Sequence, residues 1–332
     1  MKKLYTLSLS LLTISLSFAQ ISEPFMSAAG TPLNTVGWLT HQGTAGQMLI
    51  TAGSLNYTGI TSQGNKTQIV AGNSEDVNLA STTPLTGVAY YSGLISLPNT
   101  DGLPLNTDAI GNYSLGTTSV ISSTTTAFQA RIYFRAGTAP GTFNLGVLNN
   151  SGGVAAPTWI TTDYTAATTY FVVVKYDLTT NTASLWVNPN IGGTETVANV
   201  TNATGTTAAP AQIAGLIIRQ SGSAGIGTGN TEIDELRLGS TWASVTSSIL
   251  RTNQNAIAGL RVYPNPVTNG TLFIETSANA EKTVVVFDVL GKKVLSTSTN
   301  DNAVNIGSLN AGVYIVKITE EGKTASRKLV IR

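Results

Sequence analysis

The sequence contains no cysteine, only one histidine and few charged residues. Without cysteine there are no disulfides, thiolate nucleophiles or cysteine-ligated metals, so stability must come from core packing. His41 is the only imidazole, and no Gly-x-Ser-x-Gly segment accompanies it, which argues against a Ser-His-Asp triad. The same lack of ligands argues against a zinc site. We expect His41, close to Trp38, to lie on a polar loop.

Charged residues make up 11% of the chain and are unevenly placed. Residues 20–258 carry seven Lys/Arg against eleven Asp/Glu, whereas residues 259–332 carry nine against six. No cluster of basic residues offers a footprint for a phosphate backbone, so nucleic acid is not an expected partner. The 33 glycines and the abundance of Thr, Ser and Asn indicate many strands joined by tight turns, and therefore an all-β protein.

The N-terminus has the three parts of a secretory signal peptide, predicted for residues 1–19. Lys2 and Lys3 precede an apolar run from Leu4 to Leu16, and Ser17-Phe18-Ala19 places small residues where signal peptidase reads them. The run is shorter than the roughly 20 residues that a membrane-spanning helix needs. We predict cleavage between Ala19 and Gln20. No later apolar run exceeds the length of a strand, so we expect a soluble mature chain with no membrane span.

A polar stretch from Thr246 to Ala258 divides the rest of the chain. It predicts a passenger domain over residues 20–248, a linker over 249–259 and a C-terminal domain over 260–332. In the last domain, short alternating runs are separated by turn segments such as Asn269-Gly270 and Gly291-Lys292. This pattern predicts a small Ig-like antiparallel β-sandwich of about seven strands. Gly291 and Gly312 would permit positive φ at turns.

Four blocks of the C-terminal domain carry a family resemblance. They are Leu260–Val267 with its Tyr-Pro-Asn-Pro core, Val286–Val294, Leu309–Ile318 and Lys328–Arg332. In this order they resemble the type A sorting domain of the type IX secretion system of Bacteroidota. The resemblance implies passage through the periplasm to the outer cell surface or the medium, with the type IX machinery and a surface sortase as partners. The motif residues are Tyr263, Pro264, Asn265, Pro266, Asp288, Gly291, Gly312, Tyr314, Lys328 and Arg332. The two prolines also favour an edge strand or a bend, because they remove backbone donors.

The second half of the passenger has clear strand patterns. Phe128 to Arg135 alternates apolar and polar residues, which predicts a strand with a polar outer face. The runs 170–175 and 183–187 flank Asp177–Thr182, which predicts a hairpin. Together with the runs 213–219 and 233–238, this region resembles the laminin-G or concanavalin-like jelly rolls of secreted Bacteroidota proteins. The expected fold is therefore a large jelly-roll sandwich followed by the small one.

The segment Glu232–Arg237 partly matches a catalytic motif of concanavalin-like glucanases. Concanavalin-like glucanases carry Glu-x-Asp-x-x-Glu, whose outer carboxylates act as nucleophile and acid/base. Here the sixth position is Arg237, so the proton donor is missing. We therefore expect no enzyme, and a closing strand over Asp234–Leu238 whose charges face water. No cofactor is expected; calcium, with oxygen ligands from Glu75, Asp76 and Asp101, stays an open alternative.

Aromatic residues suggest ligand contacts, because their rings stack on sugars as well as packing in cores. Trp159, in a loop-like stretch, is the strongest candidate for an exposed ring, and the pair Tyr90-Tyr91 is another. Trp38 and Trp242 are weaker candidates, and Trp186 is expected in the core. The leading hypothesis is a non-catalytic module that binds a glycan or matrix component. A glycoside-active enzyme with a displaced second carboxylate, and a structural adhesin, are the alternatives.

Overall fold

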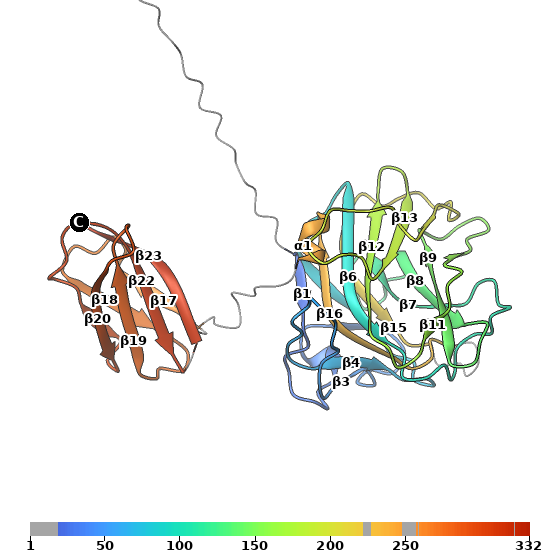
Figure 1. Cartoon of the computed structure of the whole chain (residues 1–332), viewed down its shortest axis with the longest axis horizontal. Helices are drawn as coiled ribbons and strands as arrows, with labels where there is room; N and C mark the ends of the chain where they lie inside the picture. Colours follow the sequence, from blue (N-terminus) through green and yellow to red (C-terminus); the bar gives the residue numbers. More distant parts are fainter. Residues whose placement is uncertain (1–18, 222–226, 248–256, 258, 322) are drawn as a thin grey trace, which may run out of the picture. The chain divides into compact units, whose positions relative to one another are not determined.

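The computed structural model describes residues 19–221, 227–247, 257, 259–321 and 323–332. The chain forms two compact units, residues 1–249 and 250–332 (Figure 1). The predicted signal peptide, apart from Ala19, lies outside the described residues, as does most of the predicted linker 249–259. Gln20 immediately precedes the first strand, and its backbone N–H donates to the Leu238 carbonyl at 2.6 Å.

The first unit consists of two antiparallel sheets. Sheet A has the order β14 (Val200–Asn202), β13 (Thr182–Val187), β12 (Tyr170–Asp177), β6 (Val88–Ser96), β16 (Thr231–Gly239), β4 (Lys66–Ile69) and β3 (Leu49–Thr51), with β1 (Ile21–Glu23) also paired to β16. Sheet B has the order β10 (Thr158–Trp159), β9 (Thr142–Leu148), β8 (Phe128–Ala136), β7 (Asn112–Thr118), β15 (Ile213–Arg219), β5 (Asp76–Leu85) and β2 (Leu39–Gln42), with β11 (Tyr164–Thr165) also paired to β9. The short helices are the 3-10 helix η1 (Leu33–Thr35) and α1 (Trp242–Thr246).

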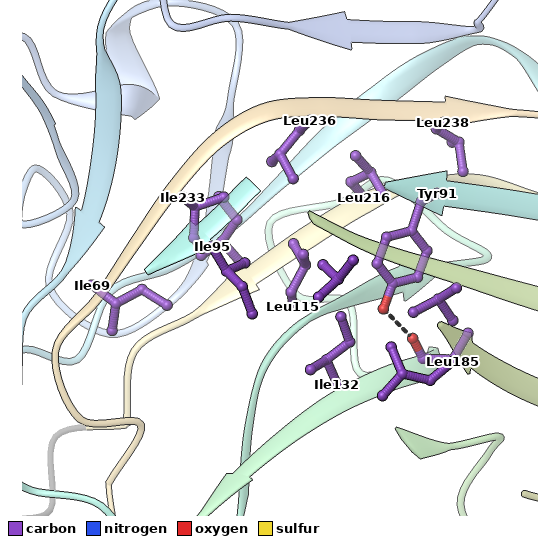
Figure 2. Packing of buried hydrophobic residues seen from close by; sticks show 14 of the residues in the cluster. Ile69, Tyr91, Ile95, Leu115, Ile132, Leu185, Leu216, Ile233, Leu236 and Leu238 are labelled. Carbon is purple, nitrogen blue, oxygen red and sulfur yellow. Dashed lines mark hydrogen bonds between the residues drawn. The ribbon is translucent and has the colours of Figure 1, made fainter. Parts of the chain in front are cut away.

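The main core lies between the two sheets. Side chains from sheet A, such as Tyr91 and Leu185, meet side chains from sheet B, such as Ile132 and Leu216 (Figure 2). The Tyr91 hydroxyl donates to the Ala130 carbonyl at 2.6 Å, so its polar atom is satisfied inside the core. Each fully buried aliphatic side chain contributes about 1.5–3 kcal/mol, which accounts for stability without disulfides.

The outer face of sheet A is closed by a second apolar cluster. Phe171, Val173 and Trp186 project there, because alternate residues of their strands face the main core. Helix α1 covers them with Trp242, whose ring centroid is 5.0 Å from that of Trp186. Trp186 is therefore buried, as predicted.

The observed strands follow the predicted patterns closely. In β8, Ala130, Ile132 and Phe134 are buried, and β12 and β13 form the predicted hairpin. The strand order and pairing confirm the predicted all-β, two-sheet jelly-roll architecture.

The second unit is a small antiparallel sandwich. One sheet has the order β17 (Arg261–Tyr263), β18 (Thr271–Glu275) and β21 (Ala303–Asn305). The other has the order β20 (Lys293–Thr299), β19 (Lys282–Phe287), β22 (Gly312–Glu320) and β23 (Lys323–Ile331). Its core is separate from that of the first unit and includes Leu272, Val284, Val316 and Leu329. The predicted Ig-like sandwich is confirmed.

The Tyr-Pro-Asn-Pro segment lies between β17 and β18 of one sheet and contacts β23 of the other. Strand β17 is an edge strand, as the prolines favour. Beyond it, the Asn265 side chain donates to the Lys328 carbonyl at 2.8 Å and accepts from the Val330 amide at 2.9 Å. The Arg332 amide then donates to the Val267 carbonyl at 2.9 Å. The first and last motif blocks are thus joined in the folded domain.

The other motif residues shape turns. The Asp288 carboxylate accepts from the amides of Leu290 and Lys292, each at 2.9 Å. Gly291 has a φ of +83°, as predicted. The prediction for Gly312 is wrong: it lies outside the positive-φ region, begins β22 and sits against the Tyr314 ring. The Tyr314 hydroxyl donates to the Asn310 carbonyl at 2.9 Å, closing that turn.

Candidate functional site

The outer face of sheet B carries a continuous row of arginine and aromatic side chains, here called the arginine face. Because Ala130, Ile132 and Phe134 of β8 point into the core, Arg131, Tyr133 and Arg135 point outward. Strand pairing then brings distant residues alongside them. The arginine face comprises Trp159, Arg135, Tyr133, Arg131, Tyr113, Arg219 and Asp76.

Two of its arginines stack on tyrosine rings. The guanidinium carbon of Arg131 lies 5.1 Å from the Tyr113 ring centroid and 5.7 Å from that of Tyr133. From β15, Arg219 approaches the Tyr113 ring at 4.6 Å. Each such cation–π contact contributes about 0.5–2 kcal/mol, depending on its desolvation. The guanidinium planes are therefore held in fixed positions on the sheet.

Arg135 is held in the same way, 4.3 Å from the Trp159 ring centroid. That ring rests on glycine backbone: a Cβ at Gly146 would come within 2.8 Å of it, and one at Gly111 within 2.7 Å. Its Nε1 donates to the Ala109 carbonyl at 3.0 Å. Trp159 is thus a half-buried residue of strand β10 rather than the exposed loop ring that was predicted, because Arg135 lies over it.

Two connecting segments border the arginine face. On one side, the Asp108 carbonyl accepts from Arg135 Nη1 at 3.2 Å. On the other side, the Ser122 carbonyl accepts from Asn78 Nδ2 at 3.0 Å. Arg131, Arg135 and Arg219 between them are half-buried.

The charge of this face is predominantly positive. Asp76 lies 3.7 Å from Arg219 Nε and accepts from the Gln220 amide at 2.9 Å, and Asp108, on the bordering segment, attracts Arg135 electrostatically. Burial raises the pKa of Asp76 to about 7, although Arg219 and the Gln220 amide act in the opposite direction. Near neutral pH, Asp76 therefore offsets only part of the charge of the three arginines.

Several polar atoms of the face have no partner within the described residues. They include Nε and Nη2 of Arg131 and Nε of Arg135. A buried donor or acceptor without a partner costs about 1–3 kcal/mol in folded proteins, so a bound water, ion or ligand that supplies an acceptor would stabilise these groups. The Arg131 and Arg135 atoms are buried beneath half-exposed side chains on the outer face of sheet B, whereas an apolar cluster and helix α1 cover much of the outer face of sheet A.

His41 lies at the margin of this face, and the prediction of a polar loop is wrong. It is a residue of β2, only 8% exposed, with Nδ1 3.2 Å from Asn78 Nδ2 and its ring centroid 5.3 Å from that of Phe128. Burial, with a further contribution from Arg219, lowers the pKa of His41 to about 4. A neutral ring can accept at Nδ1 from the Asn78 amide, whereas a protonated ring cannot.

We expect an NMR titration of the untagged mature chain to give His41 a midpoint near pH 4. The single histidine makes its ring signal unambiguous. Because the folded pKa lies below the usual value of 6.5, the unfolded chain binds the proton first as pH falls. The His41 contribution to stability is therefore complete above pH 6.5 and is lost toward pH 4, by about 2–3 kcal/mol in total.

The matched control is His41→Gln, which should remove this part of the acid sensitivity of the unfolding free energy. A titration midpoint near 6.5 in the folded protein would contradict the prediction.

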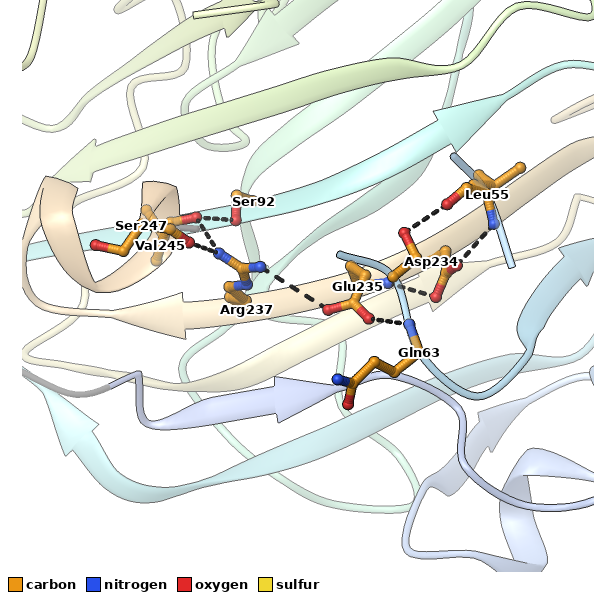
Figure 3. A network of polar contacts seen from close by, with 9 residues as sticks. Leu55, Gln63, Ser92, Asp234, Glu235, Arg237, Val245 and Ser247 are labelled. Atoms are coloured by element: carbon orange, nitrogen blue, oxygen red, sulfur yellow. Dashed lines mark hydrogen bonds and ion pairs between the residues drawn. The ribbon is translucent and has the colours of Figure 1, made fainter. Parts of the chain in front are cut away.

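The segment Glu232–Arg237 is a strand, as expected, but the prediction that its charges face water is wrong. Asp234 is 0%, Glu235 2% and Arg237 2% exposed. The Asp234 carboxylate accepts from the amides of Leu55 at 2.9 Å and Glu235 at 2.7 Å (Figure 3). Glu235 Oε1 accepts from the Gln63 amide at 2.9 Å. Strand β16 lies inside sheet A, and these carboxylates fasten the segment between β3 and β4 onto it.

Arg237 fastens helix α1 to the same strand. Its Nη1 donates to the carbonyls of Val245 at 3.3 Å and Ser247 at 2.7 Å, and its Nη2 lies 3.8 Å from Glu235 Oε2 (Figure 3). Glu232, by contrast, is partly exposed and pairs with Lys66 at 2.8 Å. These acidic groups are thus occupied by structural contacts. Burial raises the pKa of Asp234 to about 7.

The remaining aromatic candidates are packed inside the unit. Tyr90 is 7% and Tyr91 1% exposed, so neither ring can serve as a stacking surface. Tyr90 belongs to the outer cluster of sheet A and Tyr91 to the main core, since adjacent strand residues face opposite ways. Trp38 stacks on Phe25, and Trp242 covers Trp186.

The three carboxylates considered as calcium ligands each have different surroundings. The Glu75 carboxylate accepts from the Thr40 hydroxyl and the Met48 amide, each at 2.6 Å. Asp76 faces Arg219, and Asp101 lies in an exposed turn. Within the part of the chain that the structure describes, no group of three or more His, Asp or Glu residues is placed to hold a metal. Calcium binding stays a prediction.

Comparison with known proteins distinguishes the two units. Residues 261–332 match the family model of the secretion system C-terminal sorting domain. Two curated proteins are similar to about a quarter of the chain. They are an endo-acting ulvan lyase of Formosa agariphila, 30% identical over 28% of this chain and 19% of its own length, and the ulvan lyase NLR42 of Nonlabens ulvanivorans, 30% identical over 26% and 17%. The chain thus spans less than a fifth of the length of these relatives.

Among solved structures, the chain is similar to lectin II from Ulex europaeus, with a TM-score of 0.37 and 10% identity over 68% of this chain and 98% of that one. It is also similar to the carbohydrate recognition domain of Emp47p, with a TM-score of 0.35 and 10% identity over 62% of this chain and 89% of that one.

In the described part of the chain, no helix is both long and apolar enough to cross a membrane. The matched motif blocks and the fold of the second unit identify residues 261–332 as a type IX C-terminal sorting domain.

Proposed function

We propose that the first unit is a non-catalytic carbohydrate-binding domain, exported by the type IX secretion system and displayed on the cell or released outside it. The observation that carries this proposal is the arginine face. It offers planar hydrogen-bond donors at fixed positions on the open face of a sheet, and sugar hydroxyls are recognised by such groups.

The contrast between the two sheets supports this location. Much of the outer face of sheet A is covered by an apolar cluster with Phe171 and Trp186 and by helix α1, and its partly exposed cations Lys66 and Lys175 are paired with carboxylates. The carboxylates of β16, which a glycosidase would need free, hold backbone amides instead. The sorting domain supports the route of export. Names of the two ulvan lyase relatives are consistent with a polysaccharide context.

A glycan array probed with the mature chain, residues 20–332, tests this function. We expect the protein to bind at least one class of glycan. Arg135→Gln should lower the affinity more than tenfold, because it removes the guanidinium held by Trp159. The matched control is Lys175→Gln, a change at a cation on the outer face of sheet A that pairs with Glu195.

The same glycans should show no cleavage after prolonged incubation. Turnover that is abolished by Glu232→Ala would overturn the non-catalytic assignment and support the glycoside-active alternative. If the protein binds no glycan on the array, carbohydrate binding is wrong and the adhesin alternative is left.

A further inference from the structure

The arginine face concentrates positive charge on a unit that is acidic overall. Residues 20–258 carry seven Lys/Arg against eleven Asp/Glu, yet Arg131, Arg135 and Arg219 lie together on one face of one sheet. Within the described residues, Asp76 is the carboxylate that pairs with one of them, and Asp108, on the bordering segment, also attracts Arg135 electrostatically. This concentration of positive charge is a local property of sheet B, because the unit as a whole has more acidic than basic residues.

Arg131 and Arg135 differ from the other cations of the unit in their partners. Lys66 pairs with Glu232 at 2.8 Å and Lys175 with Glu195 at 3.0 Å. Arg237 lies 3.8 Å from Glu235, and Arg219 lies 3.7 Å from Asp76. Within the described residues, neither Arg131 nor Arg135 has a carboxylate within 4.0 Å.

Both arginines are nevertheless built into the sheet. Gly116 lies under Arg131, where a Cβ would come within 3.1 Å of the arginine Cγ, and Gly146 lies under the Trp159 ring that supports Arg135. Rings hold the two guanidinium groups in place, and their buried Nε atoms have no acceptor among the described residues. Such an arrangement fixes the position of two unpaired positive charges, and an anion can accept charge-assisted hydrogen bonds from the guanidinium N–H groups that are not buried.

We infer that the ligand of the arginine face is an acidic glycan, whose carboxylate or sulfate groups are bound by Arg131 and Arg135. This inference rests on the proposed carbohydrate-binding function and names the class of its ligand. Three arginines are too few for a nucleic-acid backbone, for which six to ten phosphate contacts are typical. A glycan chain, with an anion on some residues and hydroxyls between them, suits a face that mixes guanidinium and amide groups.

Binding of the mature chain to two matched pairs of polysaccharides tests the inference. Polygalacturonate is compared with its methyl ester, and dextran sulfate with dextran, by calorimetry at constant ionic strength. We expect at least one acidic member to bind more than tenfold more tightly than its neutral counterpart. The two pairs separate carboxylate from sulfate recognition. Arg131→Gln and Arg135→Gln should each weaken that binding more than tenfold.

Two controls separate specific recognition from diffuse charge. Lys175→Gln removes one positive charge from sheet A and should leave binding unchanged within about twofold. Arg131→Lys keeps the charge but loses the planar fork, so it should lose most of the affinity. Circular dichroism and the unfolding midpoint establish that each variant is folded.

The outcomes distinguish this inference from the function on which it rests. Equal binding of the acidic and neutral members would overturn the inference and leave carbohydrate binding in place. An equal loss in Lys175→Gln and Arg131→Gln would also overturn it, because the effect would then be one of net charge. No binding to any glycan would overturn both.

Discussion

Removal of residues 260–332 is expected to leave the first unit folded but confined to the periplasm of a bacterium that has the type IX apparatus. The signal peptide predicted for residues 1–19 accounts only for passage across the inner membrane. The second step is expected to require the sorting domain, which residues 261–332 form. Fractionation of cells producing the truncated and full-length chains, with detection of the first unit, measures the effect.

The fold explains why truncation should not unfold the first unit. The main core draws only on residues up to Leu238, whereas the core of the sorting domain begins at Ile257. Units with separate cores usually melt separately, so the full-length chain should show two unfolding transitions and the truncated chain only the first.

A transfer experiment provides the control. Residues 260–332, fused to an unrelated reporter that carries a signal peptide, should move the reporter to the cell surface or the medium. The reporter without these residues should stay in the periplasm. If the truncated chain reaches the surface as well as the full-length chain does, the sorting assignment is wrong for this protein.

Local patterns predicted the strands well, because alternation depends only on neighbouring residues. Residues 130–135 show this: Ala130, Ile132 and Phe134 face the core and the arginines face outward, although Phe128, before the bulge at Ala130, packs on Tyr113 instead. The edge strand before Pro264 and the turn at Gly291 follow from the same kind of local chemistry.

Burial of charged residues could not be predicted in this way. Asp234, Glu235 and Arg237 are interspersed with apolar residues as solvent-facing residues would be, but β16 has a bulge at this point, and residues 54–63 and helix α1 cover the charged groups. His41 is buried for a similar reason, since Asn78 and Phe128 pack against it from other strands. Which segment covers a sheet depends on contacts between residues far apart in the sequence.

Only part of the arginine face could be predicted from the sequence. Arg131 and Arg135 could be placed on a polar outer face by alternation alone. Tyr113 and Arg219, which complete the row, lie on the neighbouring strands β7 and β15. Strand order decides that they meet, and the sequence pattern carries no signal for it. The better clue was the presence of Gly116 and Gly146 inside strands, because a glycine there often marks the close approach of another group.

Arg237→Ala is expected to destabilise the first unit by about 3–5 kcal/mol, because it leaves the carboxylate of Glu235 in a buried site without its cation. It also removes the donor to the carbonyls of Val245 and Ser247, which end helix α1. The cluster around Trp242 and Trp186 depends on that helix. The loss should therefore appear in the unfolding midpoint of the first unit.

Glu232→Ala, five residues earlier on the same strand, is the matched control. Its partly exposed pair with Lys66 should contribute no more than about 1 kcal/mol, as surface ion pairs do. Denaturant unfolding of the mature chain measures both variants, and the transition of the sorting domain, which contains neither residue, serves as an internal reference.

Adding Glu235→Gln to Arg237→Ala should recover part of the loss. The amide oxygen of glutamine can still accept from the Gln63 backbone, while the buried negative charge is removed. The double variant therefore separates the cost of the unpaired charge from the cost of detaching helix α1. Should Arg237→Ala cost no more than Glu232→Ala, the network on β16 does not fasten the outer layer of sheet A, and its carboxylates would have to be reconsidered as functional groups.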